Sequence, residues 1–374
     1  MRNRENSIDP KIRAILKKVE DSEDLTPQDA LSLLKVSGKE FSALQQTADH
    51  LCFEKKEDVV TFVINRNINF TNICYQGCKF CSFSVSKQDQ DGYLLSIEDI
   101  KGKIKQAKDI GCTEVCIQGG INPDLDLDYY LNILKTAKQV DSNIHTHAFS
   151  PQEVYSLSKF FGNSIEETLI ELKKAGLDSM PGTAAEILVD KIRKIICPNK
   201  IVSSQWVEII KLAHNLGIPT TSTIMYGHIE ELEDRVAHLE IIRELQKETN
   251  GFTEFVPLPF VKEKPSLSNL PNFPLRPSYG LADLKLFCVA RLFFHNYIDN
   301  IQCSWVKLGP KFAQVSLEYG VNDFSGTLME ENISKSAGAE FGEYIRPQEI
   351  IDIIKDASKK PAQRDTLYKI IRYF

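Results

Sequence analysis

Three cysteines lie within eight residues, at Cys74, Cys78 and Cys81 of the segment ICYQGCKFCSF. A structural zinc site normally has four protein ligands, and no second cysteine pair lies nearby. A redox-active pair would use Cys78 and Cys81 and leave Cys74 without a role, and buried structural cysteines are not expected in so short a polar loop. An iron–sulfur cluster on three thiolates leaves one iron open to an external ligand. The spacing Cys-x3-Cys-x2-Cys therefore favours a cluster that binds a small molecule.

The segment CYQGCKFC resembles the cluster motif of the radical S-adenosylmethionine (SAM) superfamily. The resemblance implies a [4Fe–4S] cluster on Cys74, Cys78 and Cys81. Its fourth iron would bind the amino and carboxylate groups of SAM. An electron from the cluster would then cleave SAM into methionine and a 5′-deoxyadenosyl radical. Phe80 would lie beside the adenine.

The sequence Gln118-Gly119-Gly120 is similar to the glycine motif that follows the second strand in this superfamily. The resemblance implies that Gln118, Gly119 and Gly120 meet the methionine amino group of SAM. Glycine suits such a position, because a residue without a Cβ atom lets a ligand approach the backbone closely.

The run from Thr223 to Glu230 is similar to the superfamily pattern G-x-I-x-G-x-x-E, with Thr223, Gly227 and Glu230 at the matching positions. It departs from the pattern at Thr223, where glycine is usual. Glu186 and Arg193 match positions that approach the SAM ribose and carboxylate in related enzymes. Arg193 could equally be a solvated helix residue.

Beyond the superfamily, the chain from about Asn65 onward resembles subunit 2 of FO synthase. The resemblance implies transfer of the 4-hydroxybenzyl group of L-tyrosine to 5-amino-6-(D-ribitylamino)uracil. The products would be 5-amino-5-(4-hydroxybenzyl)-6-(D-ribitylimino)-5,6-dihydrouracil and 2-iminoacetate, on the route to the deazaflavin FO of coenzyme F-420. The segments that carry the resemblance are NINFTNICYQGCKFCSFS, EVCIQGGINPDLDLDYY, IHTHAFSPQEV, AGLDSMPGTAAEILVD, ICPNKI, TSTIMYGHIE, GFTEFVPLPFV, WVKLGP and GTLMEENISKSAGA.

The same resemblance implies a mechanism and partners. The adenosyl radical would take a hydrogen from tyrosine, the Cα–Cβ bond would break, and a 4-hydroxybenzyl radical would add to the uracil ring. The complete FO reaction needs a second radical enzyme, which some organisms fuse to this one. Because this chain holds one Cys-x3-Cys-x2-Cys motif, we expect a separate subunit 1, together with an electron donor for the cluster.

The nearest alternatives are two radical SAM enzymes of the menaquinone pathway, aminofutalosine synthase and dehypoxanthine futalosine cyclase. They share the cluster and the fold. The segments HAFSPQEV and PGTAAEILVD favour FO synthase over both.

Two further classes of function remain as alternatives. A metal-dependent hydrolase barrel could use His145, His147, His228 and Asp323 to bind zinc and activate water. Against it, that superfamily carries its histidine pair on the first strand, whereas this pair lies on the third. A non-enzymatic cluster-binding protein is the other alternative, and the glycine motif argues against it.

Three polar residues are candidates for substrate contacts. His147 could form a hydrogen bond with tyrosine or uracil, or it could be a structural histidine. Asn322 and Asp323, at the end of the last predicted strand, could contact the uracil or ribityl groups, or they could cap the fold.

The candidate functional residues lie in a chain whose predicted strands and helices alternate. Eight apolar runs alternate with segments of helical periodicity, which predicts an α/β fold of the (β/α)8 TIM-barrel type with an N-terminal helical extension. A doubly wound open sheet is the competing fold. In a barrel, chemistry occurs at the carboxyl ends of the strands, where the cysteines and the QGG motif would lie. The predicted strands are Val60–Phe70, Glu114–Gln118, Ile144–Phe149, Leu177–Met180, Thr220–Tyr226, Gly251–Leu258, Ile301–Val306 and Val321–Phe324.

Two domains are predicted. Residues 1–58 form an N-terminal helical segment, since proline and threonine stand where helices would begin. Residues 59–374 form the radical SAM barrel with C-terminal helices. A long connection rich in proline follows the sixth strand and suggests a lid or binding loop.

Composition narrows the class of partner. The 374 residues contain 45 Lys and Arg against 51 Asp and Glu, for a net charge of −6. This mild acidity, without a basic run, argues against nucleic acid and for small molecules. No apolar run is long enough to span a membrane, and the first residues show no signal sequence. Nine cysteines, an odd number, fit a reducing cytoplasmic location better than a disulfide framework.

Overall fold

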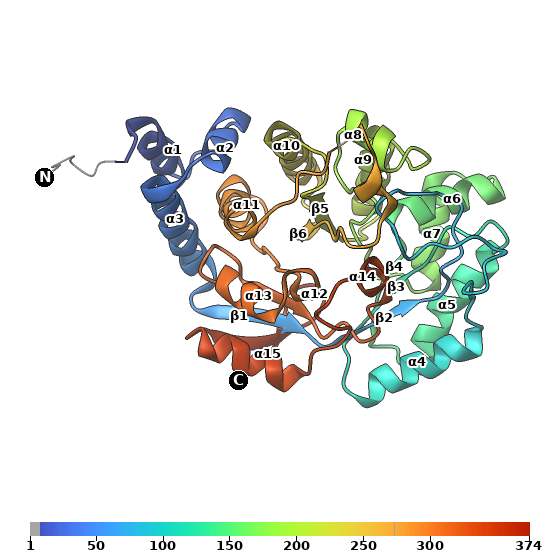
Figure 1. The fold of residues 1–374 in the computed structure, drawn as a ribbon. Helices are drawn as coiled ribbons and strands as arrows, with labels where there is room; N and C mark the ends of the chain where they lie inside the picture. The colour runs from blue at the N-terminus through green and yellow to red at the C-terminus, as the bar shows by residue number, and fades with distance from the viewer. Residues whose placement is uncertain (1–7, 273) are drawn as a thin grey trace, which may run out of the picture.

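The computed structural model of the chain describes residues 8–272 and 274–374, so the first seven residues of the predicted N-terminal segment lie outside it. Proline stands in the first turn of α1 and of α2, where a missing N–H has no cost. Thr26 and Asp29 form a capping box at the start of α2. Helices α2 and α3 pack against α11, and all three N-terminal helices lie at one side of the molecule (Figure 1). Their bounds are Pro10–Glu20 (α1), Pro27–Leu34 (α2) and Gly38–Lys56 (α3).

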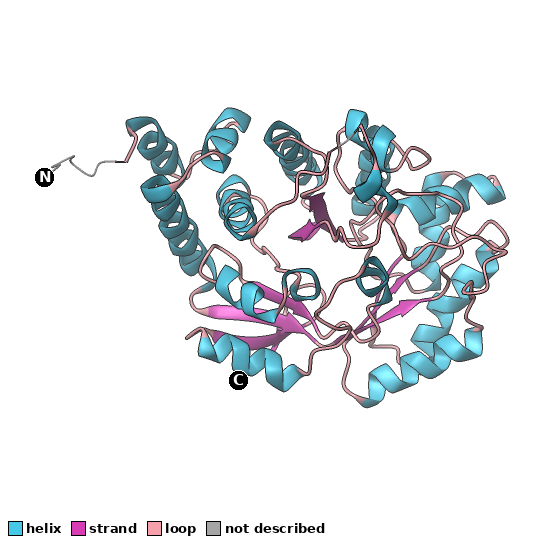
Figure 2. Ribbon diagram, viewed as in Figure 1, coloured by secondary structure: helices cyan, strands magenta, loops and turns pink. Residues whose placement is uncertain are grey.

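Parallel strands form the centre of the molecule, with the helices outside them (Figure 2). Buried residues occupy almost every strand position, as expected for a parallel sheet covered on both faces. The strands of the barrel are Val59–Val63 (β1), Asn65–Asn69 (β2), Glu114–Gln118 (β3), His145–Ala148 (β4), Thr220–Tyr226 (β5), Phe252–Pro259 (β6) and Asp323–Gly326 (β7).

The ring of strands closes through isolated bridges. Ser179 pairs with β4 and Met180 with β5, while Ile301 pairs with β6 and Gln302 with β7. Because β7 pairs with β1, and β2 continues β1 and pairs with β3, the circle is complete. The predicted (β/α)8 barrel is confirmed, and the open sheet is not observed in the described residues.

Two predicted strands are shorter than expected. Pro181 follows the bridge at Met180 and has no N–H to extend the pairing. The second, predicted over Ile301–Val306, ends early because helix α12 begins at Trp305. Each of these two short segments still occupies one strand position of the barrel.

The outer helices follow the rule that one apolar stripe faces the strands. In α4 the buried residues Ile100, Ile104 and Ala107 recur at helical spacing. Capping boxes start α4 at Ser96 and α7 at Ser164. Among the described residues, no helix has both the length and the apolar character to cross a membrane. The remaining helices are Ile97–Asp109 (α4), Leu127–Val140 (α5), Pro151–Phe161 (α6), Ile165–Ala175 (α7), Asp190–Ile196 (α8), Ser203–Asn215 (α9), Leu232–Thr249 (α10), Gly280–Phe293 (α11), Trp305–Leu308 (α12), Pro310–Ser316 (α13), Asn332–Ala337 (α14) and Pro347–Asp356 (α15).

The chain ends in a hairpin of two strands, β8 (Lys360–Arg364) and β9 (Ile370–Tyr373), which the predicted C-terminal helices do not include. Strand β8 pairs in parallel with β1. Its Arg364 binds Asp323 of β7 through two hydrogen bonds, Nε to Oδ2 at 2.5 Å and Nη2 to Oδ1 at 3.0 Å. The two side chains are 3% and 0% exposed. This buried, bidentate ion pair fixes the hairpin to the barrel.

We predict that Arg364→Met lowers the free energy of unfolding by about 3–5 kcal/mol, because Asp323 would be left as an unpaired buried charge. Urea denaturation measures the loss. The control is Arg372→Met in β9, where the arginine is exposed and a change within about 0.5 kcal/mol is expected. Equal effects of the two substitutions would show that the Arg364 ion pair does not anchor the hairpin.

Candidate functional site

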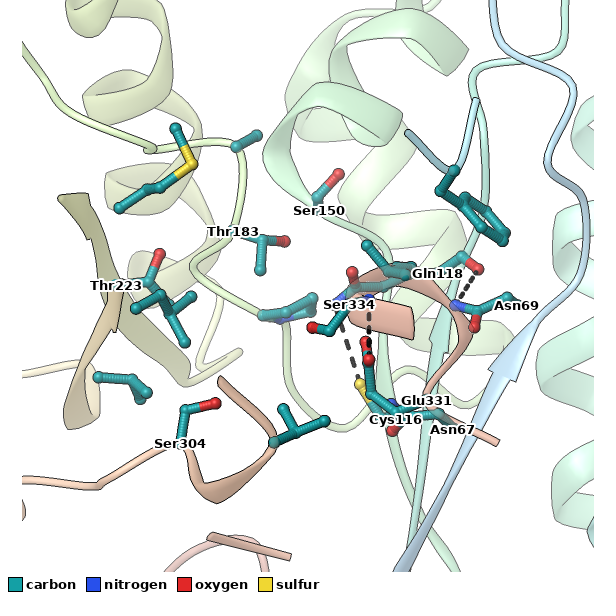
Figure 3. A pocket seen from close by; sticks show the side chains of 18 of the residues that line it. Asn67, Asn69, Cys116, Gln118, Ser150, Thr183, Thr223, Ser304, Glu331 and Ser334 are labelled. Carbon is teal, nitrogen blue, oxygen red and sulfur yellow. Dashed lines mark hydrogen bonds between the residues drawn. The ribbon is translucent and has the colours of Figure 1, made fainter. Parts of the chain in front are cut away.

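A cavity of about 400 Å³ occupies the barrel interior and the carboxyl ends of its strands. Its wall includes the loop after β2, the end of β3, the start of α6 and the inward residues of β5 and β6. Figure 3 shows the side chains of β2 and β3, Asn67, Asn69, Cys116 and Gln118, on one side and Thr223 on the other. This volume is in the range of cavities that hold small molecules.

The loop after β2 brings Cys74, Cys78 and Cys81 to the cavity wall, together with Phe80. The backbone N–H of Cys74 donates to Val85 O at 3.1 Å, and that of Cys81 donates to Cys78 O at 3.1 Å. These bonds fold the loop back on itself. The structure thus brings the three predicted cluster cysteines to one cavity from one short loop.

The three thiols are free, and burial shapes their chemistry. Burial raises the pKa of Cys74 and of Cys78, and the Cys81 thiolate would raise both further, while Lys200 lowers the pKa of Cys78. Within the described residues, no three side chains of His, Cys, Asp or Glu are grouped closely enough to hold a metal ion as they stand. Because burial favours the protonated forms of Cys74 and Cys78, these two thiols would need a positively charged centre to become thiolates.

Gly119 and Gly120 lie against the cysteine loop. A Cβ atom on Gly120 would be 2.3 Å from Ile73 O and 2.9 Å from Cys74 Cβ, and one on Gly119 would be 2.5 Å from the Phe70 ring. Gln118, Gly119 and Gly120 all line the cavity. The glycines therefore have a structural reason, which is the close approach of two backbone segments.

Glu186, predicted to contact SAM, lines the cavity beside a lysine that the sequence did not single out. The Nζ atom of Lys200 lies 2.7 Å from Oε1 of Glu186, and the two side chains are 13% and 14% exposed. The same Nζ atom is 5.6 Å from the centre of the Phe80 ring. Burial opposes the charge of Lys200, but Glu186 and then the Cys78 thiolate outweigh it and raise the lysine pKa. A charged pair thus adjoins the cysteines.

Arg193 does not line the cavity. Its guanidinium donates to the backbone carbonyls of Ala184 at 3.2 Å and Ile201 at 2.6 Å, and also to Ala185 O. These bonds brace the loop on which Glu186 adopts a left-handed conformation with φ +46°. The structure makes Arg193 a support for Glu186.

The pattern from Thr223 to Glu230 divides between the cavity and the protein interior. Thr223 lines the cavity and donates from Oγ1 to Gly182 O at 3.0 Å. Gly227 and Glu230 do not line it. Glu230 accepts hydrogen bonds from Gly227 N at 2.6 Å and from Arg235 Nε at 2.9 Å. The last part of the pattern therefore fixes the turn after β5.

Of the three candidate substrate residues, His147 alone lines the cavity. Its Nδ1 lies 2.7 Å from Ser179 Oγ, and burial lowers its pKa to about 4, so the imidazole is neutral at neutral pH. Asn322 binds Arg291 Nη2 at 2.6 Å through its Oδ1. Asp323 is held by Arg364. Asn322 and Asp323 therefore belong to the frame of the barrel.

The four residues of the hydrolase alternative do not form one site. His145 Nε2 and His147 Nδ1 both lie 2.7 Å from Ser179 Oγ. His228 is fully buried, with Nδ1 at 3.1 Å from Glu230. Asp323 makes an ion pair with Arg364. Of these four residues only His147 lines the cavity, so the described residues do not bring the four together as a zinc site would need.

Glu153 is a cavity residue that the sequence did not reveal as functional. It is 2% exposed and accepts hydrogen bonds from Ser150 N at 2.6 Å and from Gly119 N at 3.1 Å. Burial raises its pKa to about 7 in spite of these bonds. The available signal was the Ser150–Glu153 capping box, which the structure places at the cavity wall.

Other polar residues of the wall were also missed. Those of β2 and β3 lie at alternate positions of the strands, so they face the same side of the sheet, into the barrel. The signal was the alternation of asparagines in NRNIN, which is unusual for a buried strand. These residues are Asn65, Asn67, Asn69, Glu114, Cys116, Glu254, Gln302 and Arg364.

Comparison with known proteins gives two family matches and several close relatives. Residues 68–242 match the radical SAM superfamily, and residues 249–373 match the CofH/MqnC C-terminal region. The chain is similar to the 5-amino-6-(D-ribitylamino)uracil–L-tyrosine 4-hydroxyphenyl transferase of Archaeoglobus fulgidus, with 54% identity over 87% of this chain and 92% of the relative. The protein of the same name from Methanocaldococcus jannaschii is 50% identical over 93% of this chain and 97% of the relative.

Two solved structures share the fold. A crystal structure of methylornithine synthase matches with a TM-score of 0.72 and 18% identity, covering 93% of this chain and 97% of the other. The [FeFe]-hydrogenase maturase HydG from Carboxydothermus hydrogenoformans matches with a TM-score of 0.74 and 15% identity, covering 96% of this chain and 80% of the other.

We predict that Glu153→Gln changes the pH dependence of stability. The folded-state pKa of about 7 lies above the ordinary value of 4.5, so this group stabilises the fold below pH 4.5 and loses that effect as the pH rises through 7. Glutamine does not titrate. The free energy of unfolding of the variant, relative to the natural chain, should therefore rise by about 3 kcal/mol between pH 4.5 and pH 8.

Urea denaturation across this pH range measures the change. The matched control is Glu167→Gln in the exposed capping box of α7, where hydrogen bonds from Ser164 lower the pKa of Glu167. That variant should show no such rise. If the difference in unfolding free energy between Glu153→Gln and the natural chain does not change with pH, Glu153 titrates as an ordinary carboxyl group.

Proposed function

Because the chain belongs to the radical SAM superfamily and, within it, to the family of 5-amino-6-(D-ribitylamino)uracil–L-tyrosine 4-hydroxyphenyl transferases, we propose that it transfers the 4-hydroxybenzyl group of L-tyrosine to 5-amino-6-(D-ribitylamino)uracil. The observation that supports the proposal most strongly is that about half of the aligned residues are identical over nearly the whole length of these relatives. The cavity supports it, because it combines three thiols with both polar and apolar wall residues. The reaction would belong to FO biosynthesis.

The residues of the cysteine loop fit the cofactors of the superfamily, a [4Fe–4S] cluster and SAM. Cys74, Cys78 and Cys81 would hold the cluster, since among the cysteines that the structure describes these three come from one loop and line one cavity, where a cationic centre would favour thiolates. When bound, the cluster and SAM supply a 5′-deoxyadenosyl radical.

The wall beside the cysteines offers groups that match a zwitterionic cosubstrate. Lys200 would meet the carboxylate of SAM and Glu186 its amino group or ribose hydroxyls, because both are charged, partly buried and next to Phe80. Phe80 would lie beside the adenine, and Gln118 and Thr223 would add polar contacts. Arg193 would act on Glu186 through the loop it braces.

The remaining wall would hold and orient the two substrates. His147 is neutral and has one ring nitrogen engaged by Ser179. Its other nitrogen is available to a hydroxyl or an amide group of a substrate. We also propose an electron donor and a separate subunit 1 as partners, the latter because the described residues contain one cysteine motif of this type.

We predict that anaerobically reconstituted protein, given a reductant, SAM, L-tyrosine and 5-amino-6-(D-ribitylamino)uracil, forms a hydroxybenzyl adduct of the uracil, detected by mass spectrometry. Omission of either substrate serves as the control and should abolish the adduct. The matched C-terminal family also covers MqnC, so a futalosine-type substrate should be tested in parallel. Turnover of that substrate alone would overturn the proposal.

We predict that the natural chain binds about four irons and four sulfides after reconstitution, and that Cys78→Ala loses both the cluster absorbance and SAM cleavage. The control is Cys112→Ala. Cys112 is buried ahead of β3 and does not line the cavity, so this variant should keep its iron. Iron retention and SAM cleavage by Cys78→Ala would exclude the assignment of the three cysteines.

A further inference from the structure

The cavity wall has two faces of different chemistry. The face formed by β2, β3 and β4 presents amides, a thiol and an imidazole, whereas the face formed by β5, β6 and the segments after β6 presents mainly apolar side chains. The first set is Asn67, Asn69, Cys116, Gln118 and His147, and the second is Met225, Val256, Leu258, Phe260 and Val306.

The register of the strands explains the polar face. Asn67 is paired with Cys116 and Cys116 with His147, while Asn69 is paired with Gln118. Because side chains alternate along a strand, Asn67 and Asn69 point to the same side, into the barrel. Figure 3 shows the two asparagines next to Cys116 and Gln118 at the cavity.

The hydrogen bonds of these asparagines are incomplete. Asn65, at the base of the row, is satisfied, since its Nδ2 donates to Glu114 at 2.8 Å and its Oδ1 accepts from Leu328 N at 2.9 Å. Asn69 donates to Gln118 O at 3.4 Å, but its Oδ1 has no partner. The Asn67 side chain makes no hydrogen bond with the described residues, and its Oδ1 is buried.

A buried amide without partners is costly. Leaving one such group unpaired costs about 1–3 kcal/mol, and native proteins rarely keep it without a ligand or ordered water. Asn67 is 9% exposed and stands in the middle of a strand, where an aliphatic side chain would pack without this cost. The amide is therefore best explained by a ligand that completes its hydrogen bonds.

The chemistry of a primary amide defines that ligand. It places a donor and an acceptor side by side in one plane, and the complementary group is a cyclic imide, in which N–H adjoins C=O. The uracil ring carries this group on both sides of N3, with the carbonyl at C2 and with the carbonyl at C4. The hydroxyphenyl ring of tyrosine does not carry it and suits the apolar face.

We propose that Asn67, assisted by Asn69, binds the N3–H and the adjacent carbonyl of the uracil substrate and is a specificity-determining residue for it, while the face formed by β5 and β6 receives the hydroxyphenyl ring. The inference rests on the proposed function. Holding the ring by its N3–H and C2 carbonyl directs C5, which lies across the ring from C2, away from β2 and toward the apolar face. The two carbons to be joined then face each other across the cavity.

The test uses Asn67→Leu, which keeps the size and shape of the side chain and removes its donor and acceptor. Titration calorimetry on the reconstituted protein should show a Kd for 5-amino-6-(D-ribitylamino)uracil that is higher by roughly 10- to 100-fold, with the Kd for tyrosine within about twofold. The unfolding temperature of the ligand-free variant should be at or above that of the natural chain, because the unpaired amide is gone, and the iron content should be unchanged. A shift in the tyrosine Kd in place of the uracil Kd would overturn the proposal.

An analogue methylated at N3 of the uracil ring makes the test specific to this contact. The natural chain should bind it roughly 10- to 100-fold more weakly than the substrate, and Asn67→Leu should bind the two equally. The measurement on the natural chain needs no variant, so it stands even if Asn67→Leu fails to fold. Equal binding of both ligands by the natural chain would overturn the proposal.

The control is Asn143→Leu, the same substitution at an exposed asparagine ahead of β4 that does not line the cavity, and it should leave the uracil Kd unchanged. Product formation by the natural chain separates the two proposals. If the hydroxybenzyl adduct forms but N3 methylation has no effect, the Asn67 inference fails alone. If no adduct forms from these substrates, the proposed function fails.

Discussion

The close approach of two backbone segments, the end of β3 and the start of the cysteine loop, sets the geometry of the whole site. The N–H of Gly120 donates to Thr71 O at 2.8 Å, and a Cβ atom at Gly120 would overlap Ile73. With any larger residue the loop would move outward, and its cysteines would leave the cavity. The parallel register of β2 and β3 therefore determines at once where the thiols lie and where the amides of β2 lie.

Two buried or partly buried ion pairs lie in the barrel. Arg364 of β8 pairs with Asp323 of β7, and Glu186 pairs with Lys200 beside the cysteines. The polar face formed by Asn67, Asn69, Cys116, Gln118 and His147 is uncharged, since burial keeps His147 neutral. Buried charges are stable only when paired, so Arg364 and Asp323 support the frame of the barrel, whereas Lys200 and Glu186 pair at the cavity wall, where a zwitterionic ligand can meet them.

Much of the fold could be predicted from the sequence because the strands are buried on both faces. The bounds of β3 and β5 agree with the predicted runs, since continuous apolar and β-branched residues leave one interpretation. The C-terminal hairpin was missed because β9 is largely exposed and short, and its partner β8 contains a proline. Their place depends on Arg364 finding Asp323, a contact between distant parts of the chain.

The site could be predicted only where a motif carries its own geometry. The cysteine spacing is of this kind. The choice between Arg193 and Lys200 is not, because both are cations of one segment, and only the folded chain shows that carbonyl groups engage Arg193. In the same way, Asn322 and Asp323 are polar residues at a strand end, but their partners Arg291 and Arg364 come from other elements. Local sequence does not contain this information.

The two-faced cavity suggests how one barrel can hold two unlike substrates. Each strand contributes alternate residues to the interior, so the chemistry of a face follows from the identity of neighbouring strands. The cavity wall includes amides of β2 and β3 and apolar residues of β5 and β6, and Figure 3 shows Asn67 of β2 and Thr223 of β5 on opposite sides. Desolvation alone would direct the polar uracil ring to the polar face and the hydroxyphenyl ring to the apolar face, because a polar group buried against an apolar wall loses its hydrogen bonds. Orientation would then result from the order of strands in the barrel, and the reacting carbons would meet without an acid or a base to guide them.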